Sequence, residues 1–430
     1  MRPFRWLPTG QSDRFRPVAK SALEVRGPGS LLVPVFLPAT EAETLDIVAA
    51  ALSQSQPLVI AGENSKAGYG RPAAGDTMLS TRALRGVSLY EPSELVLTAA
   101  AGTPLREINA LLDQRNQQLA FEPMNFGTLY GGDPLASTLG GAIAVNASGP
   151  RRIKAGAARD HVLGFRAISG RAEIFKSGGR VMKNVTGYDM SKLMTGSFGT
   201  LAVLTEITVK VLPKAETEET LVLTGLSEAE AVAVMTEASG LQHDVSSFAH
   251  LPAALNGGHS QTALRLEGPE VSVVQRKAAL TGHFRARCKE IASLAGPASD
   301  GFWANIRDCQ PLAGLEADIW RISTTPTNGA QLVETLRLTG VPLLRHYYDW
   351  AGGLIWLALA PQADPSIAST IRAAVAGHGH ATLMRASDAM RAQVPVFHPQ
   401  PAALAALSAR VKHNFDPENI LNRGRLREDF

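Results

Sequence analysis

The chain has few cysteines for its length: only Cys288 and Cys309 among 430 residues. Two thiols are too few for an iron-sulfur cluster, which usually needs four thiolates, and the CxxCH sequence that attaches haem is missing. We interpret both cysteines as buried, reduced thiols of a cytoplasmic protein. If the chain handles electrons, it must use an organic cofactor and pass the electrons to another molecule.

Long apolar runs and a strong net charge are also missing. The longest apolar runs, such as residues 31–38, are far shorter than a bilayer span. The N-terminus carries arginines without the apolar segment of a secretory signal, which favours a loose basic tail over an organelle-targeting peptide. The net charge is +3 and the basic residues are interspersed with acidic ones, so nothing indicates nucleic-acid binding.

Two common phosphate-binding motifs are absent as well. The chain contains neither GxxxxGK[ST] nor GxGxxG, which disfavours nucleoside triphosphate hydrolysis and the Rossmann dinucleotide fold. It has instead two glycine-rich loops. Residues 62–68 follow a short apolar strand at 57–61, and their amides could form an anion nest, although such a loop alone is more typical of a surface turn. Residues 137–149 form a second loop with hydroxyls, an amide and several glycines. Two such loops on either side of a predicted helix suit FAD.

The first half of the chain alternates strand and helix signals. Residues 40–54 predict a helix with a capping box from Thr40 to Glu43 and with Leu45, Val48, Ala49 and Leu52 on one apolar face. A second helix is expected to begin with Thr103 as its N-cap, and residues 200–212 read as strand. The length predicts two domains, and the charged stretch 215–220 suits a solvent-exposed junction between them.

In the second half of the chain, the predicted strands and helices follow a different order. Strands predicted near 220–223, 246, 262, 318–323, 341–347, 354–360 and 381–385 alternate with helices predicted at 227–239, 271–280, 330–338 and 367–376. This pattern predicts an antiparallel sheet with helices on one face, a ferredoxin-like α+β cap. No sequence repeat is visible. A final helix at 403–412 leads into the terminal segment.

Long collinear blocks of the sequence carry a resemblance to a known family. They are PLVIAGENSKAGYGRP, YEPSELVLTAAAGTPLREI, GGAIAVNASGPRR, ARDHVLG, GGRVMKNVTGYDMSKLMTGSFGTLAVLTEITVKVLP and FDPENILNRGRL. Together they resemble the FAD-binding subunits of bacterial glycolate oxidases, within the vanillyl-alcohol-oxidase-like, PCMH-type FAD-linked oxidases. The resemblance is weakest at 217–391. It implies an α+β fold with an N-terminal extension (1–34), a two-part PCMH-type FAD-binding domain (35–214), the cap (215–398) and a terminal segment that returns to the FAD domain (399–430).

The resemblance also implies which residues contact FAD, many of them through backbone amides. These residues are Gly62, Glu63, Asn64, Ser65, Lys66, Pro123, Ser137, Thr138, Gly140, Gly141, Asn146, Ser148, Gly149, Asp160, Val162 and Ile207. Members of the wider superfamily that attach flavin covalently often use a histidine in the first loop, and residues 61–71 contain none. We therefore predict non-covalent FAD.

The function implied is that of an FAD-binding subunit in a glycolate oxidase or dehydrogenase complex, which oxidises glycolate or D-lactate to the 2-oxo acid. Its partners would be a second FAD-containing catalytic subunit and an iron-sulfur subunit, and the location would be cytoplasmic, with peripheral membrane association through partners as an alternative. Two other functions stay open: a stand-alone FAD-dependent 2-hydroxy-acid dehydrogenase, and a non-catalytic flavin-bearing assembly subunit.

Histidines are rare in the predicted FAD-binding domain, since His161 is the only one before residue 243. A histidine base would therefore come from the cap. His346 and Tyr347, next to Arg345, offer a base and a carboxylate-binding cation, but the same residues also fit an edge strand with aromatic packing.

Three further groups have a structural and a functional interpretation each. His378 and His380 would share one face of a strand, but a glycine-flanked turn is favoured, so no metal site is predicted. A solvated turn is likewise the commoner explanation than a phosphate or partner contact for Arg151, Arg152 and Lys154. Core anchors of the cap are the simplest interpretation of the three tryptophans in its sequence. They are Trp303, Trp320 and Trp356.

Overall fold

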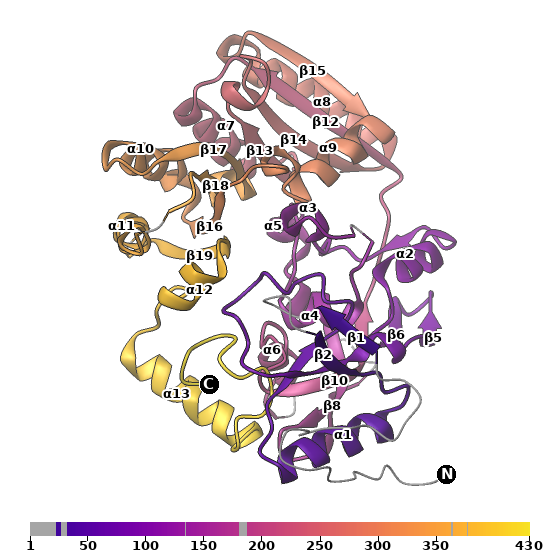
Figure 1. Cartoon of the computed structure of the whole chain (residues 1–430). Helices are drawn as coiled ribbons and strands as arrows, with labels where there is room; N and C mark the ends of the chain where they lie inside the picture. Colours follow the sequence, from indigo (N-terminus) through magenta and orange to yellow (C-terminus); the bar gives the residue numbers. More distant parts are fainter. Residues whose placement is uncertain (1–22, 27–31, 134, 180–186, 363, 376) are drawn as a thin grey trace.

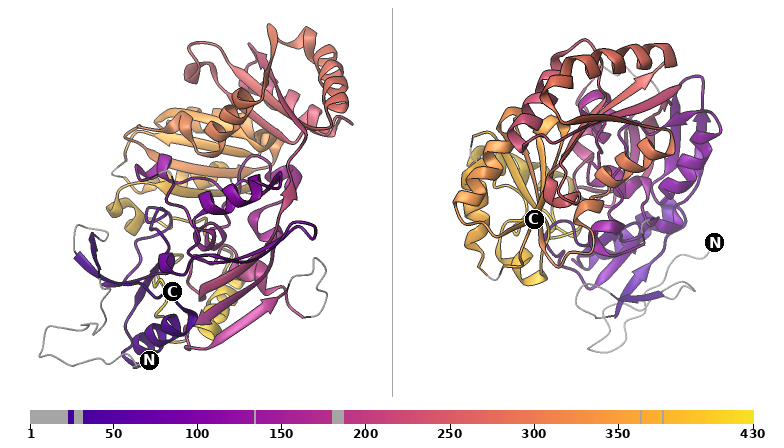
Figure 2. Two further views of the ribbon diagram at one scale, coloured as in Figure 1. Left: turned by 90° about the vertical axis from the view of Figure 1, so that its right-hand side faces the viewer. Right: turned by 90° about the horizontal axis from the view of Figure 1, so that it is seen from above.

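The computed structural model describes residues 23–26, 32–133, 135–179, 187–362, 364–375 and 377–430. Most of the predicted N-terminal extension, with its arginines, and residues 180–186 of one family block lie outside these ranges. Figure 1 shows the N-terminal domain (indigo to magenta) below most of the cap (dusky pink through orange to gold), and Figure 2 shows the same arrangement from two further sides. Within the described ranges, no helix has both the length and the apolar character needed to cross a membrane.

A small sheet opens the N-terminal domain. Its order is β1 (Leu23–Arg26), β2 (Leu32–Phe36), β4 (Thr77–Ser80), β3 (Leu58–Ala61), and β2, β4 and β3 run parallel. Helix α1 (Glu41–Ser53) connects β2 to β3 and has Thr40 as its N-cap, whose hydroxyl accepts a hydrogen bond from the Glu43 amide at 3.1 Å. The predicted capping box is only half formed, because the Glu43 carboxylate accepts from the Ala39 amide at 2.8 Å and not from Thr40. The helix buries Thr44, Ile47, Val48 and Ala51, whereas Ala49, expected on this face, is exposed.

A second, five-stranded antiparallel sheet completes this domain. Its order is β5 (Val87–Glu91), β6 (Val96–Ala100), β10 (Ala202–Lys210), β8 (Val162–Ser169), β9 (Ile174–Gly178). The segments between these strands hold short helices and strand β7, which pairs with β11 directly after β10. They are α2 (Leu105–Asp113), β7 (Gln117–Gln118), α3 (Gly127–Tyr130), α4 (Leu139–Ala144), α5 (Arg152–Ala155), α6 (Met190–Met194) and β11 (Leu212–Pro213).

The predicted N-cap of α2 is wrong. The Thr103 hydroxyl is engaged with Gly86 instead: it accepts a hydrogen bond from the Gly86 amide at 3.0 Å and lies 3.1 Å from the Gly86 carbonyl. Pro104 takes the N-cap position without a side-chain hydrogen bond. The hydrogen bonds of Thr103 to Gly86, a residue from another segment, replace the N-cap bond that Thr103 would make to its own helix.

The cap is one eight-stranded antiparallel sheet, in the order β15-β12-β14-β13-β17-β18-β16-β19. Its strands are β12 (Thr217–Thr224), β13 (Ser247–Leu251), β14 (Gln261–Gly268), β15 (Glu290–Ala295), β16 (Asp318–Thr324), β17 (Leu343–Asp349), β18 (Leu354–Leu359) and β19 (Gly379–Arg385). Its helices are α7 (Glu228–Gly240), α8 (Glu270–Phe284), α9 (Pro297–Arg307), α10 (Gly329–Leu338), α11 (Ser366–Val375) and α12 (Asp388–Gln393).

The cap contains the ferredoxin-like βαββαβ unit twice. The first unit is β12-α7-β13-β14-α8-β15 and the second is β16-α10-β17-β18-α11-β19, and they join where β13 pairs with β17. One face packs against helices through Trp320, Tyr348 and Leu357, and the other joins the core of the N-terminal domain through Tyr347 and Trp356. The predicted α+β fold class is confirmed. The predicted domain boundary at 214/215 falls between β11 and β12.

Some features of the cap differ from the prediction. Strand β15 and helix α9 were not predicted. The stretch 215–220 is not simply a solvated junction, because β12 begins at Thr217, Thr220 is fully buried and Glu218 pairs with Arg265. Trp303, Trp320 and Trp356 are buried as predicted. Both cysteines are free thiols, and Cys309 is buried whereas Cys288 is only partly buried.

The C-terminal segment packs against the N-terminal domain (Figure 1). In α13 (Ala402–Phe415), Lys412 pairs with Asp416 at 2.6 Å and donates to the Thr200 carbonyl at 2.8 Å, and both charged groups are buried. The Asn422 side chain accepts from the Ile60 amide at 2.8 Å and donates to the Phe198 carbonyl at 2.6 Å. These bonds hold residues 412–422 next to the end of β3, where the first glycine-rich loop begins.

Candidate cofactor and substrate site

The two glycine-rich loops meet at one cavity of about 380 Å³. The structure thus brings together half of the predicted FAD residues. Those that line the cavity are Gly62, Glu63, Asn64, Ser65, Lys66, Thr138, Gly140 and Gly141.

Glycine is required where the two loops approach each other. A Cβ atom on Gly62 would lie 2.4 Å from the Thr138 hydroxyl oxygen, and one on Gly140 would lie 2.8 Å from the Ala101 carbonyl oxygen. A Cβ on Gly141 would be 3.1 Å from that Thr138 oxygen and 3.4 Å from the Lys66 ammonium nitrogen. The wall of the cavity is therefore backbone, which lets a ligand contact amide groups directly.

Lys66 supplies the positive charge at this wall. Its ammonium group lies 2.8 Å from the Ser137 hydroxyl and 3.2 Å from the Ser65 hydroxyl, and no carboxylate of the described residues pairs with it. Burial lowers the pKa of Lys66 to about 8. The ammonium group also lies 5.3 Å from the centroid of the Phe126 ring. A buried cation with hydroxyl and ring partners but no carboxylate fits a phosphate ligand, because an anion would offset the cost of its desolvation. The backbone wall and this cation together fit a diphosphate.

The other predicted FAD residues do not line this cavity. Asn146 and Ser148 accept hydrogen bonds from the Arg159 and Ala158 amides, and Asp160 accepts from the Ala157 amide. Ile207 is fully buried in β10. Ser137 reaches the site through Lys66. The remaining members, Pro123, Gly149 and Val162, lie outside the lining too.

The C-terminal segment contributes cavity residues that sequence reasoning missed. Asn422 and Arg425 line the cavity, and the Arg425 guanidinium donates to the Lys66 carbonyl at 2.7 Å. Burial, together with the charge of Arg391, lowers the pKa of Arg425 to about 10. Both residues lie in the block FDPENILNRGRL, for which the sequence predicts a return to the FAD domain but no specific contact.

The structure does not bring Arg345, His346 and Tyr347 together. They alternate along β17, so the Tyr347 side chain lies on the face of the sheet toward the N-terminal domain, and its hydroxyl donates to the Ile306 carbonyl of α9 at 3.0 Å. The His346 ring faces the helices and lies 2.7 Å from Glu228. The Arg345 side chain is exposed and contacts the Pro311 carbonyl. A base and a carboxylate-binding cation therefore do not converge here.

Glu228 explains the position of His346. Burial alone would raise the pKa of this carboxyl, but hydrogen bonds from His346, Tyr348 and Arg337 outweigh burial and lower the pKa to about 2. The cluster lies on the side of the sheet that the helices cover. Its role is to anchor α7 on the sheet.

The solvated-turn interpretation of residues 151–154 is wrong for two of them. Arg151 is buried in an ion-pair network, and Arg152 stacks on Trp350 with its guanidinium carbon 4.6 Å from the ring centroid. Of the three basic residues here, only Lys154 is exposed, and it pairs with Asp244.

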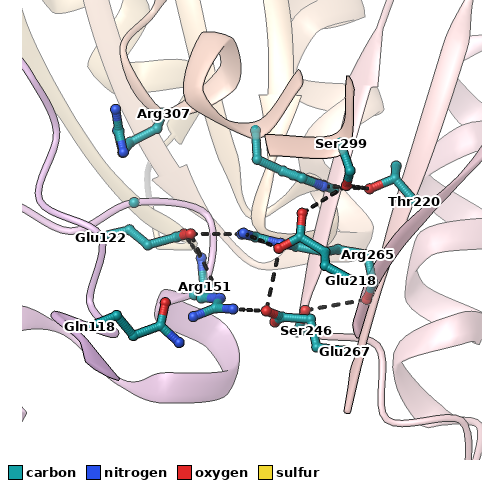
Figure 3. A network of polar contacts seen from close by, with 12 residues as sticks. Gln118, Glu122, Arg151, Glu218, Thr220, Ser246, Arg265, Glu267, Ser299 and Arg307 are labelled. Carbon is teal, nitrogen blue, oxygen red and sulfur yellow. Dashed lines mark hydrogen bonds and ion pairs between the residues drawn. The ribbon is translucent and has the colours of Figure 1, made fainter. Parts of the chain in front are cut away.

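The network around Arg151 joins the two domains (Figure 3). Arg265 of β14 pairs with Glu122 of the N-terminal domain and with Glu218 of β12, both at 2.7 Å. Arg151 pairs with Glu267 of β14. Burial raises the pKa of Glu122, but the charges of Arg265 and Arg151 outweigh burial and lower it. These five side chains hold the cap against the second glycine-rich loop. We call them the interdomain network.

The fold and this cavity together define a class, the FAD-linked oxidases. The FAD binding domain family matches residues 34–178. The solved structure of 4-ethylphenol oxidase from Gulosibacter chungangensis in an isoeugenol complex superposes with a TM-score of 0.71 at 14% identity, over 92% of this chain and 89% of that chain. At this identity the likeness shows the fold.

Sequence relatives narrow the class. Glycolate oxidase subunit GlcE of Escherichia coli (strain K12) is 37% identical over 383 residues, 89% of this chain and 96% of the relative. Glycolate oxidase subunit GlcD of Bacillus subtilis (strain 168) is 43% identical over 98 residues, 22% of this chain and 21% of the relative. The chain belongs to the GlcE family of FAD-linked oxidoreductases. The predictions of this family and of FAD as cofactor are confirmed.

Proposed function

We propose that the chain is the FAD-binding subunit of a glycolate oxidase or dehydrogenase complex, which oxidises glycolate or D-lactate to the 2-oxo acid. The observation that carries the proposal is the cavity built from both glycine-rich loops in a chain that matches GlcE along nearly its whole length. Its partners would be a second FAD-containing catalytic subunit and an iron-sulfur subunit. The predicted cytoplasmic location, with peripheral attachment through these partners as an alternative, remains part of the proposal.

The chain's own residues have distinct tasks in this proposal. The amides of residues 62–66 and 138–141 would hold the diphosphate, and Lys66 would neutralise part of its charge. When bound, FAD supplies a two-electron acceptor for oxidation of the 2-hydroxy carbon. The cap would exclude water from the reacting side. The predicted contacts of Pro123, Asn146, Ser148, Gly149, Asp160, Val162 and Ile207 belong to the same proposal.

Two other functions compete with this one. A stand-alone 2-hydroxy-acid dehydrogenase would turn over without partners, and a flavin-bearing assembly subunit would not react with substrate at all. Both would keep the same FAD cavity. The three functions predict different changes in the flavin colour when substrate is added.

Anaerobic addition of glycolate separates these functions. The FAD-loaded chain is measured alone and after co-purification with the subunits that bind it. Bleaching of the flavin in the chain supports catalysis by this chain, and dependence on the partners supports the complex. Flavin that stays oxidised in this chain in both preparations contradicts the proposal and favours the assembly function. Release of all flavin by denaturant is the expected result for non-covalent FAD.

A further inference from the structure

Arg321 occupies the face of the cap sheet that looks toward the N-terminal domain. On β16 it lies between Trp356 of β18 and Thr382 of β19, its direct neighbours in the antiparallel register. Its guanidinium carbon lies 5.8 Å from the Trp356 ring centroid and 5.0 Å from that of Trp350. This arginine therefore sits against two indole rings of the cap.

Arg152 approaches the same Trp350 ring from the other domain. It opens α5, three residues beyond Gly149 at the end of the second glycine-rich loop, and its guanidinium carbon is 4.6 Å from the Trp350 centroid. The Trp350 indole donates to the Gly149 carbonyl at 3.1 Å, which fixes the ring against that loop. One tryptophan thus brings two arginines from different domains together.

Neither guanidinium has a hydrogen bond or an ion pair with any residue in the described part of the chain. Both residues are only partly exposed. Burial, and then the nearby charges of Arg321 and Arg159, lower the pKa of Arg152 to about 10, and Asp160 only partly opposes them. The indole rings contact both cations but accept none of their N–H hydrogen bonds. A partly desolvated cation that is repelled by a like charge and has no hydrogen-bond acceptor is costly unless an anion binds there.

The neighbouring titratable groups do not neutralise the pair. Asp349 is buried and accepts a hydrogen bond from the Trp350 amide at 2.7 Å, and burial raises its pKa to about 8, so it is mainly protonated at neutral pH. Burial and the charges of Arg321, His398 and Arg152 lower the pKa of His380 to about 4, so this ring is neutral. Arg159 and Asp160 also act on Arg152, but they lie 3.9 Å from each other and carry opposite charges, so the net local charge is that of the two arginines.

The backbone that presents Trp350 is strained. Trp350 and Ala351 both have left-handed backbone angles, with φ of 51° and 57°. Such angles are costly for residues other than glycine and concentrate at functional sites. The strain is retained here because the surrounding contacts of the Trp350 indole and amide fix this turn.

The position of Arg152 and Arg321 also suits a substrate, because residues next to both glycine-rich loops lie near these two arginines. Gly149 ends the second loop. Tyr69 follows the first loop, and although burial raises the pKa of its hydroxyl, the charge of Arg321 partly offsets this rise. Arg321 therefore lies close enough to Tyr69 to act on its hydroxyl, and Arg152 follows the second loop in the sequence.

We propose that Arg152 and Arg321 form a carboxylate clamp that binds the acid group of a 2-hydroxy acid between the cap and the N-terminal domain. The guanidinium fork pairs with a carboxylate through two parallel charge-assisted hydrogen bonds, and the Trp350 ring holds both forks in place. The clamp rests on the proposed function for the identity of the acid. It selects against neutral alcohols, because these would leave both cations without a partner.

The test is calorimetric titration of the FAD-loaded full chain with oxalate, a dicarboxylate without a hydrogen to remove. We expect Arg321→Gln and Arg152→Gln each to raise the dissociation constant about tenfold to a hundredfold. Arg321→Lys, which keeps the charge without the fork, should show a smaller loss. Arg410→Gln, at an exposed position of α13, should bind oxalate as the wild type does. Glycolamide, the neutral analogue of glycolate, should bind weakly and equally to all of these proteins.

The outcomes separate the clamp from the proposed function. Unchanged oxalate affinity in both glutamine variants, or no oxalate binding by the wild type, overturns the clamp even if glycolate bleaches the flavin. Arginine-dependent oxalate binding together with a flavin that glycolate never bleaches supports the clamp and contradicts catalysis by this chain. Flavin content and melting temperature, measured on every variant, show that each one is folded and loaded.

Discussion

Two neighbouring arginines lead to two different environments at the same domain interface. Arg151 and its cap partner Arg265 are buried among three glutamates, Glu122, Glu218 and Glu267. Arg152 and its cap partner Arg321 meet at Trp350 without any acidic partner in the described chain. In the first pair, glutamates neutralise the arginine charges, and these ion pairs hold the two domains together. The second pair keeps its charge available, which is what a site for an anion requires.

The largest effect is expected from breaking the interdomain network. Arg265→Met leaves Glu122 and Glu218 buried without their main cation, so the free energy of unfolding should fall by about 3–5 kcal/mol. Denaturant unfolding of the FAD-free chain measures this fall, with Arg410→Gln as the control. A loss below about 1 kcal/mol would show that the network does not hold the cap, and the contrast between the two arginine pairs would disappear.

Lys66 is another cation without an acidic partner among the described residues, so it tests whether such a cation marks an anion site. Lys66→Met should weaken FAD binding about tenfold to a hundredfold, because the charge-assisted contacts to the diphosphate are lost. The ratio of flavin to protein after dialysis is the measurement. Lys176→Met, at an exposed site on β9, is the matched control. Equal flavin retention by both variants would remove Lys66 from the cofactor site.

The clamp should weaken at high pH because Asp349 ionises. Its buried carboxyl is mainly protonated below its pKa of about 8 and becomes an anion above it, where it competes for Arg321. Oxalate affinity should therefore fall by up to about tenfold between pH 7 and pH 9. Asp349→Asn should abolish this fall, and a fall that persists in the variant would assign the pH dependence to another group. The charged and titratable groups near Asp349 are Glu122, Arg265, Cys309, Arg321 and Tyr347.

The raised pKa of Asp349 also links pH to stability. The folded chain binds this proton more tightly than the unfolded chain, so the contribution of Asp349 to stability is complete below its unfolded pKa of about 3.8 and is lost as pH rises toward 8. Asp349→Asn should therefore raise the melting temperature relative to the wild type more at pH 8 than at pH 5. Equal differences at both values would contradict burial of an ionisable Asp349.

The sequence predicted those features that depend on neighbours along the chain or on the family resemblance. The helix predicted at 227–239 is α7, and the spacing of Ser227 and Glu230, three residues apart, forms a capping box at its start. The cap of α2 was missed because Thr103 bonds to Gly86 in another segment. The fold class and FAD followed from long collinear blocks. The duplicated cap unit was not recognised, because the βαββαβ pattern constrains apolar periodicity and not residue identity.

The cofactor site was predictable from the sequence only where the close approach of backbone segments requires a particular residue type. Glycines in the two loops marked the cavity, since only glycine permits such close approach. Nothing local distinguishes Arg151 from Arg152, because their partners Glu267 and Trp350 lie in the cap. The sequence of this basic turn therefore predicts solvation for both arginines. Long-range pairing, not composition, separates the structural arginine from the one left for a ligand.

The most direct test compares Arg151→Gln with Arg152→Gln, the same substitution at adjacent positions. For each FAD-loaded variant, the free energy of unfolding and the dissociation constant for oxalate are measured together. Arg151→Gln should lose about 1–3 kcal/mol of stability, because it leaves buried glutamate unpaired. Arg152→Gln should lose less than about 1 kcal/mol and bind oxalate at least about tenfold more weakly. Wild-type oxalate affinity in Arg152→Gln, with a stability loss as large as that of Arg151→Gln, would show that both arginines are structural.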